Sequence, residues 1–199
     1  MINAEASKPK ELFPAGAYPA RIYQIVQIGT VPGFEGKLQN KVRITFEFPT
    51  ETEVFKEEKG PQPKVMSKEF TLSTHEKAEL RKVITACDPA TNVTSYDIEN
   101  LMGKACLVTV GHGQKKDGSG KYATMTGFTF LPKGMLCPDP VNPPQKLSYD
   151  DFNLELFNKL PEFIKEKMRQ SFEFRGMDKK ETFHGMGYPD GPASDEIPF

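Results

Sequence analysis

The sequence predicts a mainly β domain in which five strands form a small barrel and one helix lies between the third and fourth strands. Three observations favour this class. Apolar and polar residues alternate in several short segments, which is typical of half-buried antiparallel strands. The 16 Gly and 17 Pro concentrate between those segments, where they indicate loops. One stretch, between the third and fourth predicted strands, has the apolar spacing of a packed helix.

The predicted strands occupy residues 17–29, 41–48, 64–73, 104–112 and 122–131. Alternation is clearest in the second strand, KVRITFEF. There the apolar and the polar, partly basic side chains separate onto two faces: Val42, Ile44, Phe46 and Phe48 against Lys41, Arg43, Thr45 and Glu47. This pattern predicts an inner face in the core and an outer face in water.

The helix is predicted within STHEKAELRKVITAC, residues 73–87. Its apolar stripe has spacings of three and four residues and consists of Leu80, Val83, Ile84 and Cys87. Ser73 followed by Glu76 has the spacing of a capping box, so we expect the helix to begin there. A second, shorter helical turn is predicted over residues 96–102 and closed by Gly103.

This order, β-β-β-α-β-β, matches the five-stranded Greek-key barrel called the OB fold. Another small barrel or an α+β sheet would also accommodate the order. We expect a flexible N-terminus over residues 1–11, an OB domain over 12–135, a Pro-rich crossing and helical extension over 136–175, and a disordered acidic tail over 176–199. Pro161 suits the first turn of a helix in the extension. Phe163, Ile164 and Met168 form its predicted apolar stripe.

Charge and motifs favour binding over catalysis. The tail holds five acids and two bases, so the net charge of −1 divides into −3 for the tail and +2 for the body. A basic body with an acidic tail favours a polyanionic partner. The chain shows no phosphate-binding glycine loop, nucleophile elbow, HExxH helix or paired CxxC. Three dispersed Cys and three dispersed His predict neither a disulfide framework nor a metal site. We therefore expect no enzyme, no cofactor and no metal.

The residue types on the predicted barrel suit unpaired nucleic acid. Cations neutralise phosphates and release counterions, and exposed rings stack on bases without regard to sequence. OB barrels bind through strands two and three and through the loops between strands one–two and four–five. The candidate residues for binding single-stranded DNA are Arg21, Tyr23, Phe34, Lys37, Lys41, Arg43, Lys68, Phe70, Lys115, Lys116, Lys121 and Tyr122.

A structural interpretation stands beside each candidate. Cations on a strand's outer face commonly serve solvation and edge protection. Phe70 shares a face with Met66 and Leu72 in a regular strand, so the core is its alternative place. Lys115 and Lys116 could simply belong to a soluble turn. Phe34 lies in a loop and is a better candidate for stacking than Phe70.

The chain ends in SDEIPF, which resembles the acidic tip of bacterial single-stranded DNA-binding proteins. That resemblance implies a partner-binding tip made of Asp195, Glu196, Ile197, Pro198 and Phe199. In that family the tip docks on replication, repair and recombination proteins. This chain departs from the pattern in having only two acids in the tip and a short linker.

The body resembles OB-fold single-stranded DNA-binding proteins of tailed bacteriophages. The resemblance covers most of residues 16–160 and lies in GAYPARIYQIVQIGT, TLSTHEKAELRKVI, LMGKACLVTVGH and LPKG. It implies sequence-independent binding of single-stranded DNA during phage replication or recombination, as a possible homo-oligomer in the host cytoplasm. Strand annealing or recombination mediation is one alternative, and an OB-fold RNA-binding or assembly protein is another. No apolar run predicts a membrane span or a secretory signal.

Overall fold

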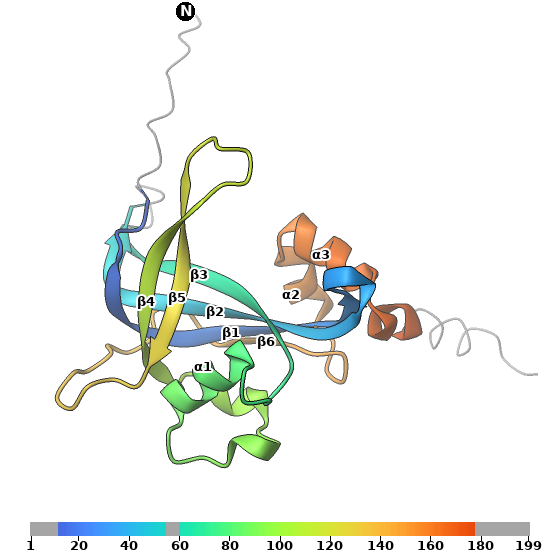
Figure 1. Ribbon diagram of the computed structural model, residues 1–199, viewed down its shortest axis with the longest axis horizontal. Helices are drawn as coiled ribbons and strands as arrows, with labels where there is room; N and C mark the ends of the chain where they lie inside the picture. Colours follow the sequence, from blue (N-terminus) through green and yellow to red (C-terminus); the bar gives the residue numbers. More distant parts are fainter. Residues whose placement is uncertain (1–11, 55–59, 178–199) are drawn as a thin grey trace, which may run out of the picture.

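The computed structural model of the chain describes residues 12–54 and 60–177 (Figure 1). It is mainly β, with a single sheet and a few short helices. The six strands are β1 (Gly16–Pro32), β2 (Leu38–Glu53), β3 (Gln62–Thr71), β4 (Ala105–Gln114), β5 (Lys121–Thr129) and β6 (Gln145–Leu147). The five predicted strands are confirmed. The sequence does not predict β6, because three residues are too few to show a periodicity.

The sheet has the strand order β3-β2-β1-β4-β5, so β1 lies at its centre. Neighbours along this path are antiparallel, and β6 pairs in parallel with β1. The sheet is not closed by hydrogen bonds between strands, since β3 and β5 remain its two edges. These edges nevertheless approach each other, because Lys68 Nζ on β3 donates to the Met125 carbonyl of β5 at 3.2 Å.

The long strand β1 pairs with two different strands along one of its edges. Its first part, residues 16–21, pairs with β4, and residues 24–26 pair with β6. Irregular register with β2 on either side of Gln24–Gln27 accompanies this change of partner. Gly29 has φ +91°, and a Cβ there would lie 2.6 Å from Glu173 Oε2. Glycine is therefore required at this position both by backbone conformation and by close approach of the C-terminal region.

The alternation of β2 separates a core face from an outer face, as the sequence predicts, but the outer face is not in water: Thr45 and Glu47 are buried, and Lys41 and Arg43 are partly buried. Val42, Ile44, Phe46 and Phe48 are at most 2% exposed. They pack with α1 (Glu79–Cys87) and with β4 and β5 in the first of two hydrophobic clusters. The helix buries Leu80, Val83 and Ile84 as predicted. Its predicted start is wrong: the N-cap is Ala78, and the Ser73 hydroxyl accepts instead from the His75 N–H in the preceding turn.

Two short 3₁₀ turns, η3 (Val93–Ser95) and η4 (Ile98–Leu101), follow α1. The second confirms the helical turn predicted over residues 96–102. The Asp97 carboxylate accepts the Glu99 N–H and so caps η4, while Gly103, at φ +75°, ends this region. A further 3₁₀ turn, η1 (Phe34–Gly36), joins β1 to β2.

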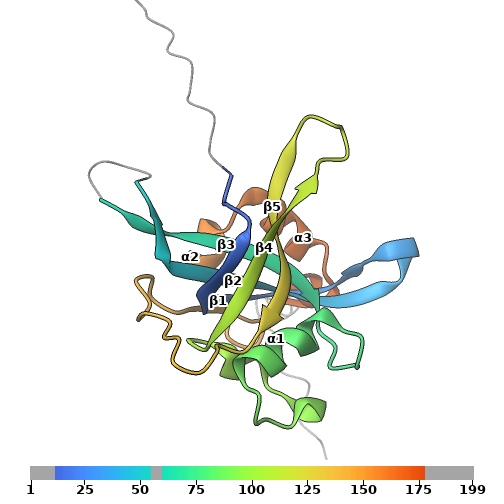
Figure 2. The same cartoon turned by 60° about the vertical axis from the view of Figure 1, so that its left-hand side comes forward.

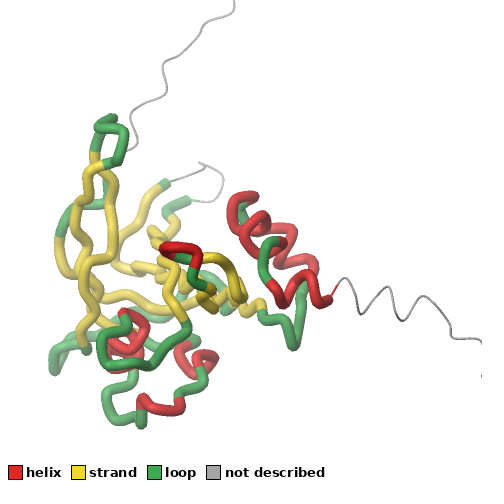
Figure 3. Tube along the Cα trace, turned by 45° about the vertical axis from the view of Figure 1, so that its right-hand side comes forward, coloured by secondary structure: helices red, strands yellow, loops and turns green. Residues whose placement is uncertain are grey.

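The C-terminal extension, residues 136–177, packs along β1. It contains β6, α2 (Leu154–Lys159) and α3 (Glu162–Arg169), with Pro161 as the N-cap residue of α3. Phe157, Leu160, Ile164 and Met168 cover Val26, Ile28 and Val31 of β1 in the second hydrophobic cluster. In Figure 3, α1 with the η3 and η4 turns forms one group and α2 with α3 forms another, and the short η1 turn lies apart from both.

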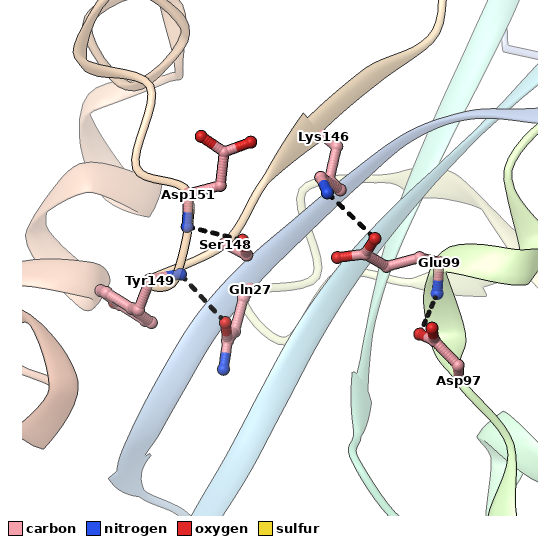
Figure 4. A network of polar contacts seen from close by, with 7 residues as sticks. All are labelled: Gln27, Asp97, Glu99, Lys146, Ser148, Tyr149 and Asp151. Atoms are coloured by element: carbon pink, nitrogen blue, oxygen red, sulfur yellow. Dashed lines mark hydrogen bonds and ion pairs between the residues drawn. The ribbon is translucent and has the colours of Figure 1, made fainter.

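Polar contacts hold β6 and the residues after it in place (Figure 4). Lys146 of β6 pairs with Glu99 of η4 at 2.9 Å, and the Tyr149 N–H donates to the Gln27 side chain at 3.2 Å. The Tyr149 hydroxyl also donates to the Ile28 carbonyl at 2.8 Å. The extension is therefore tied to both β1 and η4, and it forms one body with the sheet.

Candidate nucleic-acid interface

The β4–β5 hairpin rises away from the rest of the sheet and carries the densest group of predicted cations (Figures 1 and 2). Lys115, Lys116 and Lys121 are exposed and make no ion pair with the described residues. The Lys115 N–H donates to the Gly120 carbonyl, and Gly118 and Gly120 have positive φ, which shapes the turn. The sequence groups these lysines correctly because a tight hairpin keeps neighbours in sequence close in space.

Two further side chains define the character of this hairpin. The Asp117 carboxylate accepts from the Ser119 N–H and hydroxyl, and these hydrogen bonds hold the pKa of Asp117 below its usual range. Three lysines and this one aspartate leave a formal charge of +2. Tyr122 is 46% exposed. A Cβ at position 113 would lie 2.7 Å from its Cζ, so Gly113 provides the space that the ring occupies.

We define the outer face as the face of β1, β2 and β3 that carries Arg43, Thr45 and Glu47. At Glu47 this face is covered by residues 141–142, and we call this part the sealed end. Glu47 is fully buried, and its carboxylate accepts the N–H groups of Val141 and Asn142 at 2.7 and 2.8 Å. It also accepts from the Asn142 side-chain amide. The acid expected in solvent is therefore a buried anchor for residues 137–142.

Arg21 belongs to the same sealed end. Its guanidinium donates to the carbonyls of Gly103, Cys137 and Pro138 at 2.6, 2.9 and 3.2 Å. These bonds fix the chain that crosses the strand, and they use three of the five N–H donors of the guanidinium. Arg21 therefore has a structural role in the fold, and its contact with DNA stays a prediction. The sequence could not reveal the structural role, because the acceptors lie more than 80 residues away.

The other end of the outer face contains Arg43, and we call it the open end because Lys41 and Arg43 are partly rather than fully buried there. The Arg43 guanidinium carbon lies 5.5 Å from the ring centroid of Phe163 on α3. Arg43 makes no hydrogen bond or ion pair with any residue that the structure describes. Partial burial lowers its pKa, and Glu69 opposes that effect. Arginine stays charged under all ordinary conditions, and none of the N–H donors of Arg43 has a hydrogen-bond partner among the described residues.

Tyr23 and Lys41 flank this open end. Tyr23 is partly buried, and burial followed by the nearby Glu47 raises the pKa of its hydroxyl. Lys41 is partly buried on β2 and pairs in register with Gly29 and Thr71. Glu69, opposite Arg43 on β3, is bound by Lys167 of α3 at 2.8 and 2.7 Å. The acid beside Arg43 is thus neutralised by a different cation.

Two predicted residues of β3 lie away from the outer face. Phe70 is 2% exposed and packs at 5.9 Å from Phe128, so its predicted stacking role is wrong and the core alternative is observed. Lys68 pairs in register with the core residue Ile44, and its ammonium reaches Glu79 at 2.9 Å as well as β5. A register partner always shares the same face. Lys68 therefore bridges the sheet edges, and its assignment to the DNA-binding face is corrected.

The last predicted site residues belong to the β1–β2 connection and to the C-terminal tip. Lys37 is exposed in the β1–β2 connection, 3.8 Å from Glu35. Residue 34 lies in η1, but the placement of its side chain is outside what the structure describes. Residues 195–199, the predicted partner-binding tip, lie outside the described residues.

Sequence reasoning missed the position of Phe163. The predicted stripe places it with Ile164 and Met168, yet Phe163 is 55% exposed while those two are buried. Within α3 the buried residues are Ile164 and Met168, four positions apart, and Phe157 and Leu160 of the preceding turn join them in the second hydrophobic cluster. Phe163 therefore lies beside the buried positions of α3 and does not belong to them.

Within residues 12–54 and 60–177, no group of three or more His, Cys, Asp or Glu side chains is arranged to hold a metal ion. None of the helices in this part of the chain has the length and apolar character needed to cross a membrane. No protein-family model matches the chain, and no curated protein was found as a relative.

Proposed function

We propose that the sheet is a partly open OB barrel. Three features support this: β1 lies between a β2–β3 arm and a β4–β5 arm, α1 connects β3 to β4, and the β3 and β5 edges approach each other at Lys68. These features are the ones expected of a five-stranded Greek-key barrel that remains open at one seam. In such barrels the outer face and the two projecting hairpins are the usual binding surface for oligonucleotides.

We further propose that the protein binds single-stranded DNA without regard to sequence and takes part in phage replication or recombination. The observation that carries this proposal is the β4–β5 hairpin, where three exposed lysines without ion-pair partners in the described chain stand beside an exposed tyrosine. The lysines supply charge for phosphates and the ring supplies a surface for one base. Both interactions are independent of base identity.

The C-terminal tip adds a second part to this proposal. Asp195, Glu196, Ile197, Pro198 and Phe199 would bind replication or recombination proteins. A terminal phenylalanine suits an apolar pocket, and adjacent acids favour a basic partner surface. Their sequence separation from the barrel would let one molecule hold DNA and a protein partner together.

A titration of the whole protein tests the binding proposal. We expect labelled oligo(dT) to bind more tightly than a duplex of equal length, with an affinity that falls steeply as salt rises. Competition with poly(U) compares RNA with DNA as the ligand, because none of the proposed contacts recognises the 2′-hydroxyl of RNA. Absence of binding to oligo(dT) at low salt would remove the proposal. Equal affinity for the duplex would replace it with general binding to polyanions.

A further inference from the structure

Phe163 and Arg43 contact each other, with the guanidinium carbon 5.5 Å from the ring centroid, and both remain partly accessible to solvent. Phe163 lies outside the buried stripe of α3, and it is 55% exposed although it is a large apolar residue. Arg43 lies partly buried on the outer face without a hydrogen-bond partner in the described residues. A half-buried guanidinium without a hydrogen-bond partner loses hydration without full compensation. Such a group is poorly explained by stability and well explained by a ligand.

The surroundings of the pair leave Arg43 available. Glu69 is the nearest acid on β3, but Lys167 of the same helix as Phe163 binds both of its carboxylate oxygens. Lys167 therefore fixes α3 over the sheet and also keeps Glu69 from capturing the guanidinium. Tyr23 lies on the adjacent strand, within electrostatic reach of Arg43. The result is a cation on β2 beside an exposed ring on α3, with the partly buried Tyr23 of β1 near the cation.

We propose that Phe163 is a base-stacking residue and that Arg43 binds the phosphate of the same single strand, so that the C-terminal extension forms part of the DNA-binding surface. This inference rests on the proposed function and assigns it a specific residue. A flat ring beside a cation matches a nucleotide, which presents a flat base beside a negative phosphate. The open end of the outer face then binds one nucleotide, and the β4–β5 hairpin binds another part of the strand.

The chain contains no tryptophan, which allows a direct test. Phe163→Trp places a single fluorescent indole at the proposed stacking position. Phe172→Trp is the matched control, because Phe172 lies in the same extension and is 57% exposed. We expect oligo(dT) to quench the emission of the first variant and to leave that of the second unchanged. Equal quenching of both, or of neither, while oligo(dT) binds, would overturn the inference.

Affinity measurements give an independent readout. Phe163→Ala should weaken binding of oligo(dT) by about 5- to 150-fold, the range for loss of one stacked base. Phe163→Tyr should retain affinity, and Phe172→Ala should change it by less than about twofold. Because both residues are exposed, we expect these variants to unfold at the temperature of the parent protein. A Phe163→Ala variant that binds like the parent would overturn the inference.

An abasic strand separates stacking from charge. Phe163→Ala should leave binding of an abasic oligonucleotide unchanged, whereas Arg43→Gln should weaken binding of both strands. If Phe163→Ala weakens both strands equally, the ring acts through the position of α3 and the stacking role is wrong. If the parent protein binds neither strand, the proposed function itself fails. If the parent binds but position 163 is silent, only the further inference fails.

Discussion

The two ends of the outer face differ in the contacts that the C-terminal extension makes with a charged residue of β2. At the sealed end, residues 141–142 surround Glu47 with three hydrogen-bond donors and bury it completely. At the open end, α3 approaches Arg43 with an exposed ring and offers it no hydrogen bond. Positions 43 and 47 look equivalent in the alternation of β2, so the difference comes entirely from the covering chain.

The comparison shows how charge can be divided between stability and binding. A buried charge whose hydrogen bonds are complete stabilises its own surroundings and has nothing left to offer. A charge that is partly covered but has no partner in the described chain retains its binding capacity. On this basis, Arg21 and Glu47 belong to the fold, and Arg43 belongs to the proposed surface. Substitutions at the sealed end should therefore lower stability, whereas substitutions at the open end should weaken binding.

The largest expected effect is on stability at the sealed end. Glu47→Ala removes three charge-assisted hydrogen bonds and should lower the free energy of unfolding by about 3 kcal/mol. Glu47→Gln keeps the shape and one acceptor oxygen, so we expect a smaller loss. Urea denaturation measures both. Since Glu47 is buried, the folded fraction of either variant should bind oligo(dT) like the parent. An unchanged urea midpoint for Glu47→Ala would break the comparison.

A second effect, on binding alone, is expected at the β4–β5 hairpin. Replacing Lys115, Lys116 and Lys121 together by glutamine should weaken oligo(dT) binding about tenfold. It should also reduce the slope of log affinity against log salt by about 2, since each phosphate contact to a single strand contributes roughly 0.7. Because the lysines are exposed, the urea midpoint should not change. A slope equal to that of the parent would exclude these lysines from the binding surface.

A pH-dependent effect tests how firmly the extension is fixed. Burial raises the pKa of Tyr149 to about 12, and its hydroxyl donates to the Ile28 carbonyl. The neutral hydroxyl is favoured in the folded state, while the unfolded chain ionises near pH 10. Its contribution is therefore complete below pH 10 and is lost as the pH rises towards 12. We expect this contribution to the free energy of unfolding to be about 1 kcal/mol, because water reaches part of the ring and weakens the effect of burial.

Tyr149→Phe isolates this contribution from other groups that titrate at high pH. At pH 9 the variant should be less stable than the parent in urea. The difference in the free energy of unfolding should shrink between pH 10 and 12, because only the parent has the Tyr149 hydroxyl, whose contribution is lost as it ionises. A difference that stays constant over this range would show that Tyr149 does not hold the extension through its hydroxyl.

The smallest effect is expected in the β1–β2 connection. Lys37 is exposed and lies 3.8 Å from Glu35, which offsets part of its field. Lys37→Gln should therefore weaken oligo(dT) binding by less than about twofold at physiological salt. Lys116→Gln, an exposed lysine of the other hairpin, is the matched single substitution and should have the larger effect. The reverse order would place the main cationic contact beside β1 and β2.

The sequence determined the local features of this protein. Alternation in residues 41–48 correctly separates core from outer face, because a strand's two-residue period depends only on backbone geometry. The apolar stripe of α1 and the lysines of the β4–β5 hairpin are likewise properties of short segments. Sequence also indicates the class of proposed ligand, since residue types set the available chemistry.

Tertiary structure decided which of these residues remain available. Arg21 and Glu47 are occupied by residues about 80 to 120 positions away, and Lys68 crosses the gap between β3 and β5. Phe163 joins the outer face only because α3 folds back over β1. Partners so distant in the chain leave no local periodicity. The physical reason is that hydrogen bonding and burial depend on what covers a side chain, and the pattern of a strand does not specify its cover.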